Sequence, residues 1–200
     1  HSLVKIVEFI SKLPRGKCVK TKQALVVGNS KSRQAIDLTQ LNKFEIYGCN
    51  ALYRDFTPNH LVITDLPLIK ELLETKYHIN HLVYTTPSVN YIVNRDLITL
   101  PNQTDELCPS GIRAVKLALL EHSKIYMIGL DFTNDNVYEN TPHYSDHWDF
   151  TKWIKDLEHI INKHNNCNFY RIGAQKHNIT PHSNFKEITV SEFTNKFYTY

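Results

Sequence analysis

The stretch "ALVVGNSKS", Ala24–Ser32, decides the fold class of this 200-residue chain. Its first four residues are all apolar, and they run directly into Gly28, Asn29 and Ser30. A strand with one face in water alternates apolar and polar residues, whereas a strand covered on both faces is apolar throughout. The stretch therefore predicts a buried strand of a parallel sheet, followed by a turn into a helix.

Similar apolar runs of strand length recur along the chain, most of them rich in β-branched or aromatic residues. They are Phe44–Asn50, His60–Asp65, His81–Thr86, Leu97–Leu100, Lys124–Phe132 and Asn168–Gly173. Helical patterns lie between them. "SGIRAVKLALLEH" opens on Ser110, a residue type that caps helices, and carries an apolar face. "DHWDFTKWIKDLEHIINKHN" repeats apolar residues at helical spacing from Phe150 to Ile161, and Ser145 or Asp146 can cap it. This alternation predicts an α/β fold with a single doubly wound, mostly parallel, Rossmann-like sheet and helices on both faces.

The bulk composition narrows the function classes. Hydrophobic residues make up 42% of the chain and charged residues 22%, as is typical of soluble globular proteins. A net charge of +3 with scattered basic residues gives nucleic-acid binding no support. The chain has no apolar run long enough to span a membrane, and its four cysteines are widely spaced, which favours the reducing cytoplasm. We interpret residues 1–3 as a tag remnant and residues 4–200 as one domain, beginning with a short amphipathic helix in "VKIVEFISKL".

Polar residues follow several predicted strands at the point where each strand ends. Asn29 follows the first strand, and Asn50, Asp65 and Asp131 end later ones. Because ligands of open parallel sheets bind beyond the carboxyl ends of the strands, we expect a pocket there. We expect its lining to include Gly28, Asn29, Asn50, Ser110 and Asp131.

The glycine pattern excludes two common nucleotide-binding motifs. "VVGNSKS" contains one glycine, so it matches neither the dinucleotide fingerprint GxGxxG nor the P-loop GxxxxGK[ST]. Two interpretations stay open, a plain turn or a nucleotide phosphate or ribose held by Asn29 and the backbone. The sequence Pro109-Ser110-Gly111 offers helix-terminal amides to a phosphate. A hydrolase is disfavoured, because no GxSxG elbow is present.

The segment "TPHYSDHWDF", Thr141–Phe150, allows three interpretations. His143 and His147, four residues apart, would bind a metal if both lay on one helical face, but no third ligand pattern accompanies them. In a structural interpretation Asp146 caps the helix and both histidines are incidental. In the third, His143 is a general base, a role that suits imidazole because it titrates near neutral pH.

The order of these motifs resembles the bacterial sialyltransferases of glycosyltransferase family 42, which build lipooligosaccharide, and the related DUF115 proteins. The resemblance runs from about Ala24 to Gly173 and consists of short motifs: G-N-x-x-S after a strand, a strand ending C-N, S-G opening a helix, "IYMIGLDF", and "HY" before a helix. It implies a single doubly wound domain, a GT-A-like variant of the Rossmann arrangement. It also implies inverting transfer of sialic acid from CMP-sialic acid, the donor substrate, with no metal or other cofactor required.

The resemblance assigns roles to individual residues. His143 corresponds to the general base, Tyr144 lies beside it, and Tyr138 approximates a tyrosine that supports the leaving phosphate. Asp65 stands where a donor-site asparagine is expected. The donor-binding residues implied on this basis are Gly28, Asn29, Ser30, Asn50, Asp65, Ser110, Gly111 and Asp131.

The chain also departs from the family pattern. The family's GNGPS is GNSKS here, Thr133 replaces the tyrosine directly after G-x-D-F, and the segment between Phe132 and His143 is shorter than the family's lid. We therefore expect a soluble, cytoplasmic glycosyltransferase that uses a nucleotide-sugar donor and a glycan or glycolipid acceptor. A catalytically inactive nucleotide-binding module of the same fold is the alternative. The sequence leaves peripheral membrane contact and homo-oligomer formation open.

Overall fold

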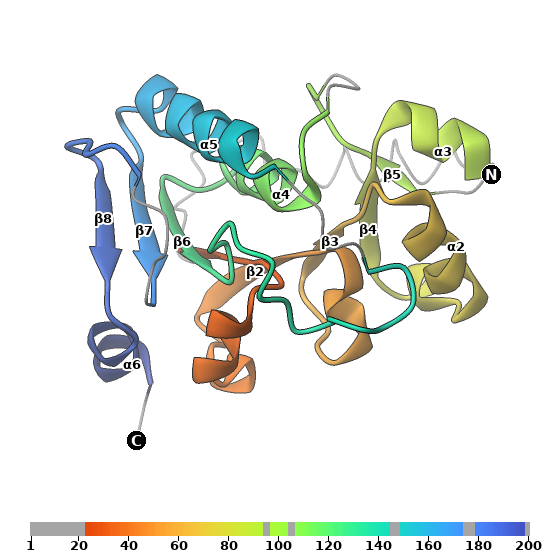
Figure 1. The fold of residues 1–200 in the computed structure, drawn as a ribbon, viewed down its shortest axis with the longest axis horizontal. Helices are drawn as coiled ribbons and strands as arrows, with labels where there is room; N and C mark the ends of the chain where they lie inside the picture. Colours follow the sequence, from red (N-terminus) through yellow and green to blue (C-terminus); the bar gives the residue numbers. More distant parts are fainter. Residues whose placement is uncertain (1–22, 94–96, 104–106, 145–148, 174–178, 199–200) are drawn as a thin grey trace, which may run out of the picture.

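An eight-stranded parallel sheet forms the centre of the molecule (Figure 1). The computed structural model describes residues 23–93, 97–103, 107–144, 149–173 and 179–198. Across the described strands the order is β5-β4-β3-β2-β1-β6-β7-β8, and every pairing is parallel. The strands are β1 (Gln23–Val27), β2 (Phe44–Cys49), β3 (His60–Val62), β4 (Leu82–Thr85), β5 (Ile98–Thr99), β6 (Lys124–Ile128), β7 (Asn168–Ile172) and β8 (Phe185–Ile188).

The strand order places a topological switch point between β1 and β6. The chain moves outward from β1 to β5, then returns to place β6 on the other side of β1 and continues outward to β8. The connections that follow β1 and β6 therefore leave the sheet in opposite directions, which opens a crevice at their carboxyl ends. This is the edge at which the sequence predicted a pocket.

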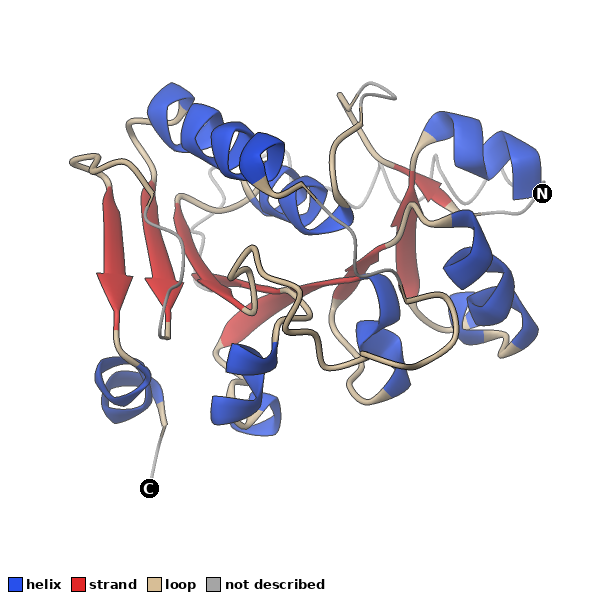
Figure 2. Ribbon diagram, in the orientation of Figure 1, coloured by secondary structure: helices blue, strands red, loops and turns tan. Residues whose placement is uncertain are grey.

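Helices cover both faces of the sheet, as predicted (Figure 2). Alternate residues of β1 belong to two separate apolar clusters: Ala24 and Val26 to one, Leu25 and Val27 to the other. The first cluster is covered by α4 (Ser110–Ala118) and α5 (Thr151–Lys163), and the second by α2 (Leu66–Glu74) and α6 (Val190–Phe197). The remaining described helices are α3 (Pro87–Val93) and the short 3₁₀ helices η1 (Lys31–Ala35), η2 (Leu38–Gln40), η3 (Asn50–Arg54) and η4 (Tyr77–Ile79). Because both faces are covered, β1 is apolar and buried from Ala24 to Val27.

Several boundaries differ from the sequence-based expectation. The strands end earlier than predicted, so Asp65 and Asp131 lie in the loops after β3 and β6 rather than at strand ends. Ser110 is not the cap of α4: Pro109 holds that position, and Ser110 is the first helical residue. Helix α5 begins at Thr151, and the predicted caps Ser145 and Asp146 lie outside the described residues, as do the tag remnant and the helix predicted in "VKIVEFISKL".

In the described part of the chain, each helix is too short or too polar to cross a bilayer.

Candidate functional site

A cleft of about 650 Å³ lies at the carboxyl edge of the sheet, at the switch point between β1 and β6. Its walls come from the turns after β1, β2 and β3, the first turn of α4, and the segment between β6 and α5. Of the residues predicted from the sequence, those that line it are Gly28, Asn29, Ser30, Asn50, Asp65, Ser110, Gly111, Tyr138, His143 and Tyr144. Asp131 is the exception: it is buried behind the lining, 7% exposed.

Asn29 and Asn50 lie side by side in the cleft. Asn29 Nδ2 donates a 3.2 Å hydrogen bond to the carbonyl of Cys49, the residue before Asn50. Both Oδ1 atoms are buried, and neither accepts a hydrogen bond from any described residue. A buried acceptor without a donor costs about 1–3 kcal/mol. Two such amide oxygens in one cleft are typical of a site whose ligand supplies the missing donors.

The backbone conformation of Asn50 also costs free energy. Asn50 has φ of +51°, a left-handed conformation that asparagine tolerates better than most residues. It is the first residue of η3, directly after β2, so this conformation turns the chain sharply at the cleft. Unusual backbone conformations of this kind concentrate at functional sites.

A close backbone contact requires glycine at position 28. A Cβ built on Gly28 would lie 2.1 Å from the carbonyl oxygen of Gly129, because the turns after β1 and β6 pass in backbone contact. Ser30 N donates to that same Gly129 oxygen at 3.0 Å, and Ser30 Oγ accepts from Asp131 N at 3.3 Å. Gly28, Ser30 and Asp131 therefore hold the two turns of the switch point together.

The first turn of α4 forms another wall of the cleft. No side chain of the described residues caps this turn at Pro109, and the Ser110 hydroxyl instead hydrogen-bonds Thr64 Oγ1 at 2.8 Å. The N-terminal amides of a helix carry a partial positive charge, so this wall suits an anion. Asp65 lies across the same cleft, and burial raises its pKa against the opposing effect of His143.

The segment Thr133–Tyr144 closes the cleft on the β6 side and is tied to the turn after β1. Val137 N donates to the Asn29 carbonyl at 2.8 Å, and Lys31 N donates to the Asp135 carbonyl at 3.0 Å. Among the side chains of this segment, the Tyr144 hydroxyl donates to the Asn134 carbonyl at 2.8 Å. The turn that carries Asn29 and the loop that carries His143 are thus parts of one hydrogen-bonded unit.

The Tyr138 hydroxyl forms hydrogen bonds with other side chains of the protein. It donates to Asp55 and accepts from Arg33 Nη2 at 2.8 Å. Burial, followed by the hydrogen bond to Asp55, raises the Tyr138 pKa far above its ordinary value. Tyr138 lines the cleft, and its hydroxyl joins the ion pair between Arg33 and Asp55.

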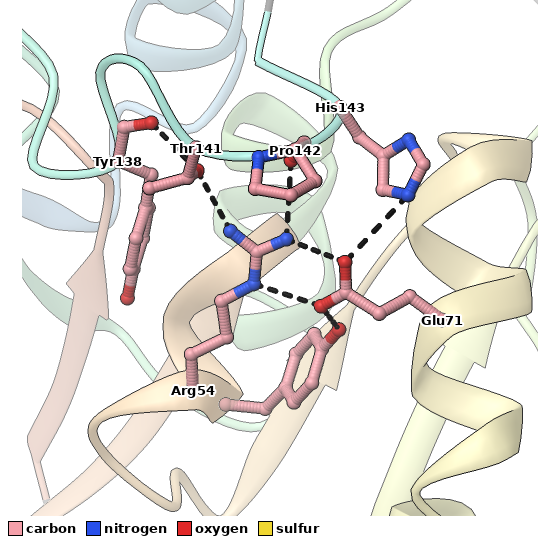
Figure 3. Close-up of polar contacts among 7 residues, drawn as sticks. Arg54, Glu71, Tyr138, Thr141, Pro142 and His143 are labelled. Atoms are coloured by element: carbon pink, nitrogen blue, oxygen red, sulfur yellow. Dashed lines mark hydrogen bonds and ion pairs between the residues drawn. The ribbon is translucent and has the colours of Figure 1, made fainter.

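His143 lies at the end of the cleft nearest to α2 and is 39% exposed. Its Nε2 is 3.7 Å from Glu71 Oε2, and its backbone is left-handed, with φ of +67°. Glu71 also accepts hydrogen bonds from Arg54 and Tyr53, and Arg54 in turn contacts the loop that precedes His143 (Figure 3). The Arg54 guanidinium, together with Tyr53 and His143, holds the pKa of Glu71 below its ordinary value.

The sequence did not indicate Arg54, Glu71 or Tyr53. They lie in η3 and α2, far along the chain from His143, and no motif spacing joins them. Polar residues just after predicted strands were the only available signal, and Arg54 and Glu71 lie too far beyond β2 and β3 to be singled out by it.

A metal site would need several ligands close together. Among the described residues, no three His, Cys, Asp or Glu side chains are grouped so that they could hold an ion. His147 lies outside the described ranges. Comparisons of the chain with models of protein families, with curated proteins and with solved structures find no match.

Proposed function

We propose that the protein is an inverting glycosyltransferase that transfers a sugar from a nucleotide-activated donor, sialic acid from CMP-sialic acid or a similar sugar, to a glycan hydroxyl. The observation that carries this proposal is one cleft at the switch point that is lined by two open amide oxygens, by a helix N-terminus and by a histidine beside α2. A volume of about 650 Å³ is in the range of ligand pockets.

The donor would occupy the centre of the cleft. Asn29 and Asn50 would accept hydrogen bonds from N–H or O–H groups of the nucleoside, which satisfies their Oδ1 atoms. The amides of the first turn of α4 would receive the phosphate and stabilise the negative charge that grows as the nucleotide leaves. This arrangement needs no metal to neutralise a single phosphate.

His143 would act as the general base. Glycosyl transfer to a hydroxyl requires a group that takes the acceptor proton as the new bond to the anomeric carbon forms. His143 is the titratable residue at the end of the cleft that is both exposed and adjacent to a carboxylate. The acceptor would therefore approach from the side of α2.

The test is release of CMP from CMP-sialic acid in the presence of acceptor glycans. We expect His143→Ala to lower the rate of the chemical step by about 10²–10⁴-fold while CMP affinity stays nearly unchanged. His147→Ala should have a far smaller effect, and EDTA none. Equal losses from both histidine variants, together with inhibition by EDTA, would instead establish the metal site.

A nucleotide-binding module without transfer activity is the second candidate. One observation favours it: the Tyr138 hydroxyl, which approximates a leaving-group ligand in the resemblance, is bound to Asp55 and Arg33. Tight CMP binding without CMP release, for any of the donors and acceptors offered, would decide for this candidate.

A further inference from the structure

His143 is held by a network that the proposed function leaves unexplained. Arg54 makes four hydrogen bonds: Nε and Nη2 donate to the two carboxylate oxygens of Glu71 at 2.8 and 2.6 Å, Nη1 donates to Thr141 Oγ1 at 2.8 Å, and Nη2 donates to the Pro142 carbonyl at 3.1 Å. One guanidinium thereby joins η3, α2 and the loop that carries His143 (Figure 3).

The bond from Arg54 to Pro142 acts on the backbone of His143 itself. The Pro142 carbonyl and the His143 amide nitrogen belong to the same planar peptide group. The bond to that carbonyl orients the peptide plane directly before the His143 Cα, where φ is +67°. A histidine in this conformation costs free energy, and such conformations persist where the surrounding structure enforces them.

Glu71 acts on the imidazole ring. Its Oε2 lies 3.7 Å from His143 Nε2, beyond hydrogen-bonding distance, so the interaction is electrostatic. The carboxylate favours a proton on Nε2, the ring nitrogen nearer to it, and leaves Nδ1 unprotonated. In Figure 3 Nδ1 points away from Glu71. Glu71 is itself fixed by the two Arg54 bonds and by the Tyr53 hydroxyl.

We propose that Arg54 and Glu71 are positioning residues for His143: Arg54 sets the backbone of the histidine, and Glu71 selects the tautomer in which Nδ1 is the proton acceptor. The catalytic part of this inference rests on the proposed function, whereas the tautomer does not. Neither residue touches the reacting atoms; both act through His143.

Nitrogen NMR of ¹⁵N-histidine-labelled protein tests the tautomer without donor or acceptor. The chain has 11 histidines, so the His143 signals are identified by their loss in His143→Asn. At alkaline pH, where imidazoles are neutral, free histidine populates both tautomers, with the Nε2-protonated one predominant. We expect His143 to carry its proton on Nε2 to a greater extent than free histidine does, and Glu71→Gln should lower that share toward the free-histidine value.

Glu74→Gln is the matched control, because Glu74 lies one turn further along the same helix, is exposed, and borders the same small cavity beside His143. It should leave the His143 signals unchanged. A wild-type His143 protonated mainly on Nδ1 would overturn the proposal, and this measurement needs no variant to fold. Identical ring signals in wild type and Glu71→Gln would also overturn it.

Turnover assays of the same variants provide the second test. Glu71→Gln should lower kcat by about ten- to a hundredfold, less than the loss of His143 itself, with CMP affinity unchanged, and Glu74→Gln should keep wild-type kcat. An unchanged kcat in Glu71→Gln would remove its catalytic role. If the wild-type protein does not release CMP, the proposed function fails, and the NMR result alone then decides the positioning role.

Discussion

At the level of single residues, the cleft is defined by buried polar atoms that accept no hydrogen bond from the described part of the chain. A substitution of Asn29 tests whether these atoms bind a ligand, because another asparagine, outside the cleft, has a similar environment and serves as a control. Asn90 in α3 likewise donates through Nδ2 to a backbone carbonyl, that of Leu97, and likewise has a buried Oδ1 that accepts no hydrogen bond from the described residues.

We expect Asn29→Ala to weaken CMP binding by about 1–3 kcal/mol, because a ligand donor loses its acceptor. Asn90→Ala should leave CMP binding unchanged, since Asn90 does not line the cleft. Asn29→Ala removes one hydrogen bond, to the Cys49 carbonyl, and Asn90→Ala removes two, to the Leu97 carbonyl and to Thr99 Oγ1. We therefore expect the free energy of unfolding to fall by about 1 kcal/mol in Asn29→Ala and by about 1–2 kcal/mol in Asn90→Ala. Calorimetric titration of both variants decides: equal CMP affinity in wild type and Asn29→Ala would remove Asn29 from the site.

The prediction of cleft-lining residues from the sequence was confirmed for the two asparagines that stand closest to a strand end. Asn50 follows β2 directly, Asn29 is the second residue after β1, and both line the cleft. Asp131 does not line it, because β6 ends at Ile128 and the intervening turn places Asp131 behind the lining. Arg54 and Glu71 could not be found, because the bond that joins them depends on the packing of α2 against the turn after β2.

At the scale of elements, the contact between the turns after β1 and β6 sets the geometry of the cleft. Gly28→Ala would place Cβ 2.1 Å from the Gly129 carbonyl oxygen, a backbone atom that cannot move alone. We expect a loss of about 3 kcal/mol or more in the free energy of unfolding.

Gly111→Ala is the control for this prediction. Its Cβ would meet the end of the Leu130 side chain at 2.8 Å, which can rotate away, and alanine is the better helix former. The change in the free energy of unfolding should stay within about 1 kcal/mol. Urea denaturation measures both variants, and equal stabilities would contradict the proposed backbone contact.

The predicted elements and the observed ones agree where the pattern is strong. The sequence pattern was sufficient to predict the strands β1, β2 and β6, from their apolar runs, and the helix α5, from its helical spacing. Strand β8 was missed, because it lies at the edge of the sheet and its "FKEI" exposes Lys186 and Glu187. Helix α6 was missed although Thr189 and Glu192 form a capping box, a signal visible in the sequence.

At the scale of the whole molecule, strand order could not be predicted, because it depends on pairings between strands far apart in the sequence. The switch point between β1 and β6 became known only from the structure. What the pattern did indicate is that parallel strands share one carboxyl edge, and this was sufficient to bring most of the predicted residues into one cleft.

Global stability should depend on pH through His60 at the opposite end of the sheet. Its ring stacks on Tyr47, and its nitrogens contact Tyr84 and Glu45. Burial lowers the pKa of His60 below the ordinary 6.5, outweighing Glu45, which raises it. The folded state therefore favours neutral His60. Its contribution to stability is complete above pH 6.5 and is lost as pH falls through the lower native pKa, because the unfolded chain takes up the proton first.

We expect the free energy of unfolding to fall less steeply between pH 7 and 5 in His60→Gln than in wild type, by up to about 1.4 kcal/mol per pH unit. His159→Gln, which removes an exposed histidine of α5, should keep the wild-type slope. Urea denaturation across this pH range measures the difference. Equal slopes in wild type and His60→Gln would contradict the assignment.

Whether the cleft binds a nucleotide is tested by the melting temperature of the wild-type protein titrated with CMP, and with UDP and GDP for comparison. A ligand that binds only the folded state at a hundredfold excess over its Kd stabilises it by about 2.7 kcal/mol, which raises the Tm of a chain of this size by roughly 5–10 °C. We expect a concentration-dependent rise with CMP that is strongly reduced in Asn29→Ala and retained in Asn90→Ala. A Tm that stays constant at millimolar concentrations of all three nucleotides would show that the cleft is not a nucleotide site.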